Sequence, residues 1–305
     1  MEREKKGNRG FRRGVALPPH FKQSIVRTPA IGRVSGIIQG RGLYTVCQEA
    51  RCPNRNHCYS EGTATFLILG GSCTRSCRFC AVAKSQPAPP DPGEPEQVAW
   101  AASEMGLKYT VITSVTRDDL GDGGSGHFVR VMNKVRERNP GVSIEVLTPD
   151  FQGSQAAIDR VAAARPEVFN HNLETVARLY PTVRPQADYR RSLNLLERVS
   201  RAGLTAKSGL MVGLGESREE IKIALADLSR AGCSIVTIGQ YLAPSPLHHP
   251  VDRYWDPEEF EECRAYGQDG LGLRAVVAGP LVRSSYRARQ TFQDVNQQLR
   301  QQFSP

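Results

Sequence analysis

Short apolar runs alternate with amphipathic stretches along most of this chain, from about residue 64 to residue 278. The apolar runs end in glycine, proline or polar residues, as buried strands do, and the stretches between them have apolar residues at helical spacing. The predicted strands are 64–69, 109–113, 142–147, 168–170, 205–213, 234–239 and 275–278. The predicted helices are about 95–105, 127–138, 155–164, 189–201, 219–230 and 257–266. This alternation predicts a parallel sheet with helices outside it.

Both a barrel and an open doubly wound sheet fit this alternation, and the positions of the polar residues distinguish them. Polar or glycine-rich sequence follows almost every predicted strand, at 73–80, 113–119, 170–174, 213–216 and 240–241. A barrel site takes residues from the carboxyl ends of many strands, whereas an open sheet concentrates them at one crevice. We therefore predict an α/β fold with an incomplete barrel over residues 63–280. It follows an extended N-terminal segment, residues 1–45, that lacks strong periodicity.

The composition is that of an ordinary globular protein, with 39% hydrophobic and 23% charged residues. No apolar run is long enough to span a membrane, and the charged start lacks the apolar region of a secretory signal. We expect a cytoplasmic protein, in a reducing compartment where clustered cysteines indicate metal rather than disulfides. The net charge of +9 predicts an acidic partner, or else reflects a solvated basic tail at the N-terminus.

Six of the eight cysteines form two triplets of unlike spacing. The first triplet is Cys47, Cys52 and Cys58 (CxxxxCxxxxxC), and the second is Cys73, Cys77 and Cys80 (CxxxCxxC). Three thiolates are one fewer than a closed zinc site or a fully ligated [4Fe–4S] cluster requires, so each triplet leaves a metal position for another ligand. A zinc knuckle with a distant fourth ligand is the alternative, although zinc ligands usually come as close pairs. Cys233 and Cys263 are predicted to be small apolar residues.

The second triplet resembles the motif of the radical SAM superfamily, in which an aromatic residue, here Phe79, precedes the last cysteine. The resemblance implies that this triplet holds three irons of a [4Fe–4S] cluster and that S-adenosyl-L-methionine binds the fourth iron. It also implies the fold of the superfamily, a partial (β/α)6-type TIM barrel whose first strand leads into the cysteine loop.

The first triplet and an RSSY motif at residues 283–286 are similar to the lipoyl synthase family, and the similarity runs from about residue 46 to residue 287. By this match the catalytic ligands of an auxiliary [4Fe–4S] cluster are Cys47, Cys52, Cys58 and Ser285. The cluster would lie between an auxiliary-cluster segment, residues 46–62, and a C-terminal segment, residues 281–305. The resemblance implies a sulfurtransferase that inserts two sulfur atoms at C6 and C8 of a protein-bound N6-octanoyl-lysine. The auxiliary cluster is the expected sulfur donor.

The resemblance also assigns residues to the binding of S-adenosyl-L-methionine. They are Phe79, Thr113, Ser114, Asn172, Glu174 and Lys207. Asn172 and Glu174 alternate at a strand end and should point the same way, although a pair that caps the next helix is the alternative. Lys207 is either a ligand of the cofactor carboxylate or a charge that lines the barrel interior.

Two further groups of polar residues could suggest metal sites, but we favour structural or surface roles for them. The aspartates at 118, 119 and 122 suggest a magnesium loop, but a polar turn and helix cap is the better prediction. His248 and His249 suggest a metal site, but their proline-flanked loop predicts a surface position.

The lipoyl synthase resemblance implies its partners as well. These are octanoylated lipoyl carrier domains, on 2-oxoacid dehydrogenase E2 subunits and the glycine cleavage H protein, an electron donor such as flavodoxin or ferredoxin, and an iron–sulfur carrier for cluster repair. We expect no nucleic acid or membrane partner, and a monomer. One alternative is a tRNA methylthiotransferase, another sulfur-inserting radical SAM enzyme with two clusters. A second alternative is no enzyme but a ferredoxin-like electron carrier or a zinc-stabilised binding protein.

Overall fold

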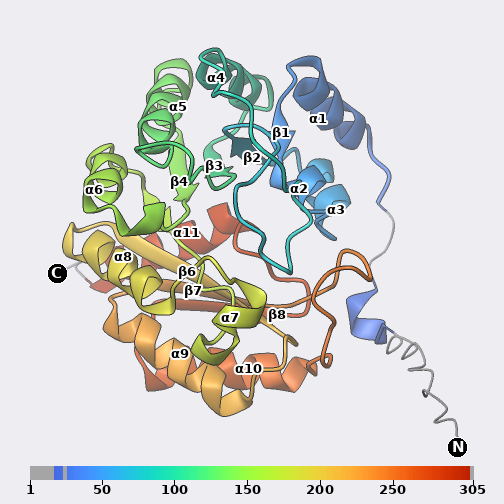
Figure 1. Ribbon diagram of the computed structural model, residues 1–305, viewed down its shortest axis with the longest axis vertical. Helices are drawn as coiled ribbons and strands as arrows, with labels where there is room; N and C mark the ends of the chain where they lie inside the picture. The colour runs from blue at the N-terminus through green and yellow to red at the C-terminus, as the bar shows by residue number, and fades with distance from the viewer. Residues whose placement is uncertain (1–16, 23–25, 303–305) are drawn as a thin grey trace, which may run out of the picture.

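The computed structural model describes residues 17–22 and 26–302 (Figure 1). Its centre is one sheet of eight strands in the order β1 to β8. The strands are β1 (Tyr44–Thr45), β2 (Thr65–Ile68), β3 (Tyr109–Ser114), β4 (Ser143–Leu147), β5 (Val168–Asn170), β6 (Thr205–Val212), β7 (Ile235–Gln240) and β8 (Ala275–Gly279). β1 is antiparallel to β2, and all later neighbours are parallel.

The barrel is incomplete, as predicted. In the described ranges no strand pairing joins β8 to β1 or β2, so the sheet is open, with β1 and β8 as its edge strands. The register places the ends of adjacent strands level, with Thr113 opposite Leu147 and Leu147 opposite Asn170. Because the strands are parallel, the loops after them gather at one end of the barrel.

Helices cover the outer face of the sheet (Figure 1). They are α4 (Glu94–Glu104), α5 (Ser125–Arg138), α6 (Gln155–Ala163), α8 (Tyr189–Arg201), α9 (Arg218–Arg230) and α10 (Pro257–Ala265). Shorter turns are η1 (Pro19–Phe21), η2 (Phe151–Gly153), η3 (Ala177–Leu179), α7 (Tyr180–Val183) and η4 (Tyr266–Gly270). Each long helix buries one apolar stripe; in α8 it includes Leu193, Leu196 and Val199. The strands from β2 to β7 are largely buried on both faces, as parallel strands beneath helices are.

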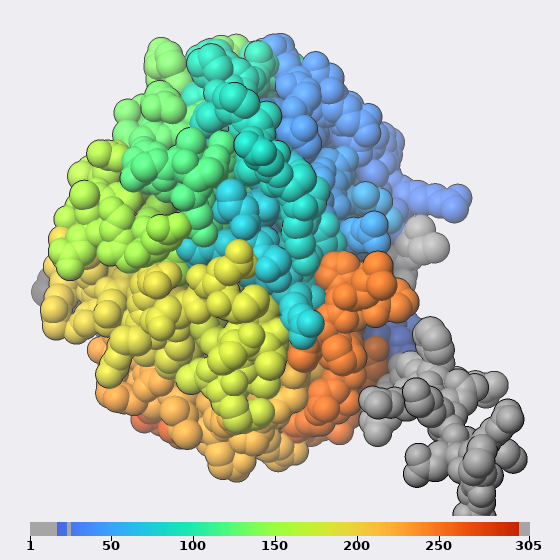
Figure 2. Space-filling model, viewed as in Figure 1, coloured from blue at the N-terminus to red at the C-terminus, as the bar shows by residue number. Residues whose placement is uncertain are grey.

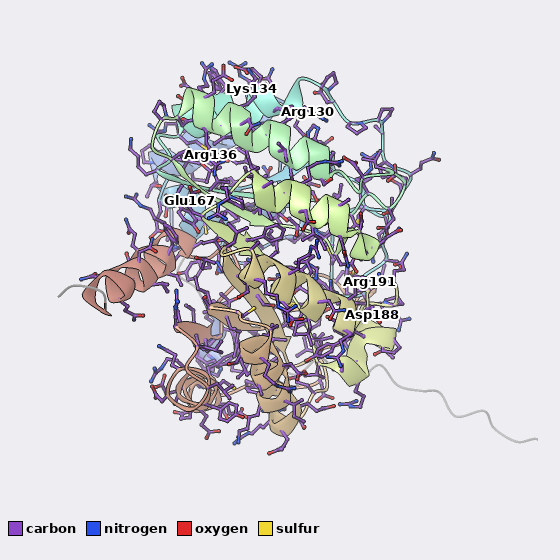
Figure 3. The ribbon with its side chains drawn as sticks, turned by 90° about the vertical axis from the view of Figure 1, so that its left-hand side faces the viewer. Arg130, Lys134, Arg136, Glu167, Asp188 and Arg191 are labelled. Carbon is purple, nitrogen blue, oxygen red and sulfur yellow. The ribbon has the colours of Figure 1, made fainter. Side chains whose placement is uncertain are left out.

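The amino-terminal end of the barrel is filled by a polar network and closed by the last helix, α11 (Ala288–Gln302). Lys207 donates to both carboxylate oxygens of Glu145 at 2.8 and 3.0 Å, and Tyr109 donates to the same carboxylate at 2.7 Å. Phe292 of α11 packs against Tyr109, with ring centroids 5.5 Å apart. Figure 3 shows α11 at the end of the barrel opposite Asp188 and Arg191.

The prediction of an extended segment over residues 1–45 is wrong for its second half, where α1 (Pro29–Gly40) is a helix. Pro29 begins the helix with a preset φ, and Val34 and Ile38 share its buried face. Three glycines in this stretch weaken the helical signal in the sequence, and burial against α3 (Arg55–Ser60) compensates for them. The basic tail, residues 1–16, lies outside the described residues.

Two loops distant in sequence approach one another across the face that contains the strand ends. In Figure 2 the proline-rich residues 84–92 (teal) run down this face toward the loop 242–252 (orange). The loop 242–252 also contacts the residues before this stretch, because the backbone N–H of His249 donates to the Arg78 carbonyl at 2.8 Å. No helix in the described part of the chain has both the length and the apolar character needed to cross a bilayer.

Candidate active site

The second cysteine triplet lies in the loop that leaves β2. Leu69 and Gly70 turn this loop at φ values of 69° and 92°, and the Cys73 N–H donates to the Ala83 carbonyl at 2.8 Å. The backbone N–H groups of Arg75 and Thr116 donate to Cys73 Sγ at 3.4 and 3.3 Å. Burial, reinforced by the neighbouring thiols, raises the pKa of Cys80 to about 12. Such buried thiols stay protonated unless a metal stabilises the thiolate.

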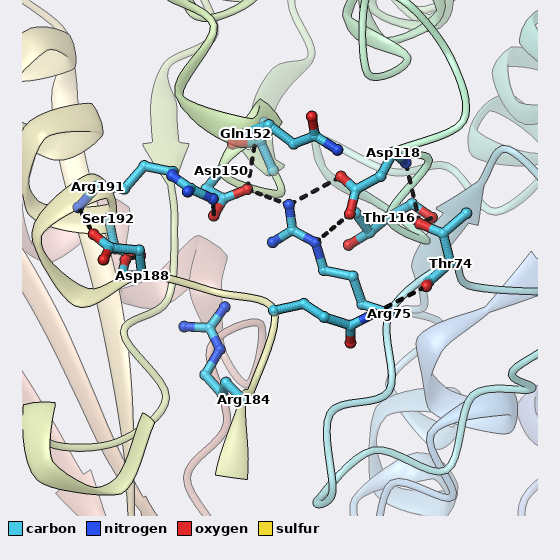
Figure 4. A network of polar contacts seen from close by, with 12 residues as sticks. Thr74, Arg75, Thr116, Asp118, Asp150, Gln152, Arg184, Asp188, Arg191 and Ser192 are labelled. Carbon is cyan, nitrogen blue, oxygen red and sulfur yellow. Dashed lines mark hydrogen bonds and ion pairs between the residues drawn. The ribbon is translucent and has the colours of Figure 1, made fainter. Parts of the chain in front are cut away.

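Arg75, between Cys73 and Cys77, fastens this loop to two other strand ends (Figure 4). Its guanidinium donates to both oxygens of Asp118 at 2.6 and 2.9 Å and to Asp150 at 2.6 Å. Arg191 of α8 donates to the other oxygen of Asp150 at 3.2 Å. Burial alone would raise the pKa of Asp150, but the hydrogen bonds and charge of Arg75 hold it at about 2. The cysteine loop is thus held by charge-assisted bonds.

Of the aspartates after β3, Asp122 caps a helix, as predicted, whereas Asp118 and Asp119 form ion pairs that were not predicted. Asp119 accepts from Arg117 at 2.9 Å. Asp122 accepts from the Gly124 and Gly126 N–H groups at the start of α5, both at 2.9 Å. Cys233 and Cys263 are buried in the core, again as predicted.

The first triplet spans two short helices, α2 (Val46–Glu49) and α3. Cys47 lies in α2, Cys58 lies in α3, and Cys52 lies in the turn between them, its N–H bonded to the Cys47 carbonyl at 3.2 Å. Burial and the neighbouring thiols raise the pKa of Cys47 to about 11 and of Cys58 to about 12. The three thiols are close enough to interact electrostatically.

The C-terminal segment returns to this triplet after β8. Asn54 donates to the Leu281 carbonyl at 2.6 Å, and the rings of His57 and Tyr286 lie 5.7 Å apart. Ser285, half-buried, stands between these two contacts. The structure therefore brings the segment that carries Ser285 against the residues around the first triplet, and the role of Ser285 as fourth ligand stays a prediction.

Asn172 and Glu174 lie in the loop after β5, and their side chains meet there. Asn172 Nδ2 donates to Glu174 Oε1 at 3.0 Å. Glu174 adopts φ 65° and exchanges backbone hydrogen bonds with Gly209 and Met211 of β6 at 2.9 and 2.8 Å. Burial raises the pKa of the Glu174 carboxyl, while the nearby guanidinium of Arg184 opposes that rise.

Of the other residues predicted to contact the cofactor, three lie near the cysteine loop or the strand ends and one, Lys207, does not. Phe79 is half-buried and packs against the core beside Cys80. Thr113 and Ser114 end β3 at the correct edge, with Thr113 Oγ1 bonded to the Leu147 carbonyl at 2.8 Å. Ser114 Oγ is buried, with no hydrogen-bond partner among the described residues. Lys207 is placed elsewhere: its ammonium is in the ion pair with Glu145, so it lines the barrel interior.

Sequence reasoning missed Arg184, which follows α7. Its Nη1 donates to the Asn172 and Leu173 carbonyls at 2.9 and 2.8 Å, and its charge acts on Cys77 and Glu174. Arg184 Nε is buried and has no partner in the described part of the chain. The local sequence offered no signal, because Thr182-Val183-Arg184-Pro185 is typical of any polar loop.

The surface prediction for His248 and His249 is wrong. Both are half-buried, and His248 Nε2 lies 3.2 Å from the Cys80 carbonyl oxygen. His249 Nε2 lies 3.0 Å from the Leu214 carbonyl oxygen. The prolines that flank these histidines fold the loop back onto the cysteine loop and not into solvent.

Neither triplet is arranged, among the described residues, to hold a single ion, and the second has features that suit a cluster. No three His, Cys, Asp or Glu side chains in the described ranges converge as the ligands of one ion do. In a four-iron cluster each thiolate binds a different iron, so its ligands stand further apart. The N–H donors to Cys73 Sγ also suit a cluster, because such bonds tune cluster sulfurs.

Comparison with known proteins agrees with this class of site. The family model described as "Radical SAM superfamily" matches residues 67–228. Methylornithine synthase superposes with a TM-score of 0.53 at 14% identity, covering 83% of this chain and 78% of that one. The hydrogenase maturase HydG from Carboxydothermus hydrogenoformans gives a TM-score of 0.57 at 15% identity, covering 75% and 56%. These structures show the fold, and the chain is a radical SAM protein.

Curated relatives narrow the class. A lipoyl synthase of Pelodictyon phaeoclathratiforme is 56% identical over 254 residues, which is 83% of this chain and 86% of the relative. A lipoyl synthase of Nitratidesulfovibrio vulgaris is 50% identical over 278 residues, 91% of this chain and 93% of the relative. Within the radical SAM superfamily, the chain belongs to the lipoyl synthase family. The predictions of S-adenosyl-L-methionine and [4Fe–4S] clusters as cofactors are confirmed by this membership.

Proposed function

We propose that the chain is a lipoyl synthase that inserts two sulfur atoms, at C6 and C8 of an octanoyl group amide-linked to a lysine of a carrier domain. One observation carries this proposal: the chain holds two separate cysteine triplets, and an RSSY segment from the far end of the sequence lies against the first of them. A radical enzyme with one cluster has no use for the second triplet.

The two triplets have different proposed tasks. Cys73, Cys77 and Cys80 hold the cluster that binds S-adenosyl-L-methionine. Cys47, Cys52, Cys58 and Ser285 hold the auxiliary cluster. When bound, these cofactors supply the radical chemistry that breaks an unactivated C–H bond and the sulfur that replaces the hydrogen. The protein keeps the two sites at a fixed separation. We propose that the chain has four functional parts: residues 1–45, the auxiliary-cluster segment 46–62, the barrel 63–280 and the C-terminal segment 281–305.

The residues at the strand ends orient S-adenosyl-L-methionine. We assign Asn172 and Glu174 to its ribose and methionine portions, with Phe79, Thr113 and Ser114 beside them. Arg184 is the cation best placed to meet its carboxylate, because its buried guanidinium acts on both Cys77 and Glu174. A buried cation that binds a carboxylate recovers part of its desolvation cost.

The proposed protein substrates are octanoylated lipoyl carrier domains of 2-oxoacid dehydrogenase E2 subunits and the glycine cleavage H protein. The reaction also needs a reductant, such as flavodoxin or ferredoxin, and an iron–sulfur carrier to rebuild the auxiliary cluster. We propose that the enzyme acts as a monomer in the cytoplasm, where its thiols stay reduced.

Anaerobic turnover of an octanoyl-lysine peptide with S-adenosyl-L-methionine and a reductant tests the proposal. We expect a mass increase that corresponds to two added sulfur atoms, and iron analysis should give about eight irons per chain. Iron near four per chain, or cleavage of S-adenosyl-L-methionine with no sulfur added to the peptide, would contradict it.

A further inference from the structure

The segment between β8 and α11 lies directly against the ends of two barrel strands. At Gly239 of β7, a Cβ atom would stand 1.9 Å from the Val282 carbonyl oxygen. At Gly209 of β6, a Cβ atom would stand 2.9 Å from Ser284 Oγ and 2.8 Å from Asn172 Oδ1. A side chain at Gly239 would overlap the backbone of the segment, and one at Gly209 would push away the Ser284 and Asn172 side chains, so the two glycines create the seat of this segment.

Within this seat Ser284, the first serine of the RSSY motif, forms hydrogen bonds with Asn172, a residue that we assign to the S-adenosyl-L-methionine site. Asn172 Nδ2 lies 2.7 Å from Ser284 Oγ, and Ser284 Oγ lies 2.9 Å from Asn172 Oδ1. The same Nδ2 donates to Glu174 Oε1. A continuous chain of hydrogen bonds therefore joins the segment that carries Ser285 to Glu174, which lies by the second triplet.

The opposite flank of the segment is held by the auxiliary-cluster side. Asn54 bonds to the Leu281 carbonyl, and His57 packs on Tyr286. Between these contacts the Arg283 guanidinium interacts electrostatically with both Cys52 and Glu174. The residues around Ser285 thus contact both cluster sites at once.

We propose that Ser284 is a positioning residue that, through Asn172, fixes the auxiliary site relative to the S-adenosyl-L-methionine site. This inference rests on the proposed function. It explains why the motif has two serines with separate tasks. The Ser284 hydroxyl both donates to and accepts from the Asn172 amide, and the adjacent Ser285 remains available as a ligand. The positioning matters because one substrate chain must reach both sites in a single turnover, and small misplacements slow such reactions strongly.

The variant Ser284→Ala, in the full chain with both clusters, tests this role. We expect about eight irons per chain to be retained, because Ser285 and the contacts Asn54–Leu281 and His57–Tyr286 remain. The dissociation constant for S-adenosyl-L-methionine should rise about tenfold as Asn172 loses a partner. More S-adenosyl-L-methionine should be cleaved per sulfur inserted. Ser284→Thr retains the hydroxyl and should restore the affinity and the ratio.

A readout independent of turnover is hydrogen exchange. In Ser284→Ala the amides of residues 279–288 should exchange faster than in the parent, while the core of β6 keeps its protection. Asn172→Ala should produce the same local change from the other side of the bond. Unchanged exchange with unchanged affinity would overturn the proposal, and so would the loss of about four irons, which would make Ser284 a cluster ligand. If the parent adds no sulfur to the peptide, the proposed function fails, whereas the exchange and affinity data still judge the role of Ser284.

Discussion

Ser285 differs from the three cysteines proposed to share its cluster in the hardness of its donor atom. An alkoxide oxygen matches iron–sulfur chemistry less well than a thiolate does, so it should leave more readily when the cluster gives up sulfur. Its neighbours hold it in place, because Asn54 bonds to Leu281 and His57 packs on Tyr286. A cysteine at this position would occupy nearly the same place.

We therefore expect Ser285→Cys to keep about eight irons per chain and to lower the rate of sulfur insertion about tenfold or more. Mass analysis of the octanoyl-lysine peptide measures the insertion, and cleavage of S-adenosyl-L-methionine is the control that should persist. Double insertion at the parent rate would show that the hardness of the ligand has no role.

Asp150 gives a prediction of pH dependence at a single residue. Its pKa is about 2 in the folded chain, below the ordinary value of 3.8, because Arg75 bonds to its carboxylate despite the cost of burial. A carboxyl whose pKa is lowered by folding stabilises the folded state when the pH is above its pKa in the unfolded chain. This contribution disappears as the pH falls from about 4 toward 2. At neutral pH it amounts to about 2 kcal/mol.

Asp150→Asn should therefore lower the free energy of unfolding by about 2 kcal/mol at pH 7, by about half of that at pH 3 and by little at pH 2. Urea denaturation of the parent and the variant across this pH range measures the difference in the free energy of unfolding. Acid destroys the clusters in both proteins equally, so their loss cancels in the comparison. The surface variant Asp159→Asn is the control, since its carboxylate is exposed. A difference that stays constant with pH would refute the role of this ion pair.

Residue types and spacing predicted the cysteine ligands that we propose, because a cluster needs several thiolates within a short loop. They did not identify Arg184 or pair Lys207 with Glu145, whose contact crosses 62 residues. Such a contact depends on the register of separate strands, and a single buried charge leaves no local pattern. The family resemblance supplied Ser285, and no periodicity in the sequence would have done so.

At the scale of elements, the strands and helices from β2 to β8 agreed with their prediction, because burial on both faces gives strands a continuous apolar run. α1 was missed since its glycines hide the helical period. The position of the C-terminal segment over Gly209 and Gly239 could not be predicted from the sequence either. A glycine in a strand looks the same in the sequence whether or not another backbone lies over it.

Gly239 of β7 makes this seat testable. Gly239→Ala would place a Cβ atom 1.9 Å from the Val282 carbonyl, so the segment that carries Ser285 must move. We expect iron to fall from about eight toward about four per chain, with cleavage of S-adenosyl-L-methionine largely retained. Sulfur insertion should be lost.

Gly36→Ala in α1 is the matched control. No atom lies within 4 Å of a Cβ built there, so iron should be unchanged, and the helix should gain up to about 1 kcal/mol. If Gly239→Ala keeps all its iron, the close approach of β7 and the C-terminal segment does not hold the auxiliary site.

At the scale of the whole molecule, the positive charge is distributed unevenly. Cations on the outer helices mostly have acidic partners, as in the pair Arg198–Asp159 at 2.5 Å and in Arg136–Glu167, whose side chains lie side by side at 3.6 Å (Figure 3). Arg55 and Arg78, within the two cysteine segments, are exposed and form no ion pair with another described residue. Two cations without an ion pair among the described residues therefore border the site.

An acidic carrier domain that approaches this rim should be steered electrostatically. We expect the double variant Arg55→Gln and Arg78→Gln to lower kcat/KM for an octanoylated carrier protein about tenfold at low salt, and much less at 0.5 M salt, where screening weakens steering in the parent too. Activity on a short neutral octanoyl-lysine peptide should not change. Arg230→Gln on α9, which removes a cation paired with Asp227, should leave both substrates unaffected. An equal loss with peptide and protein would mean that the two arginines support the clusters, and a rate independent of salt would mean that charge does not guide the carrier.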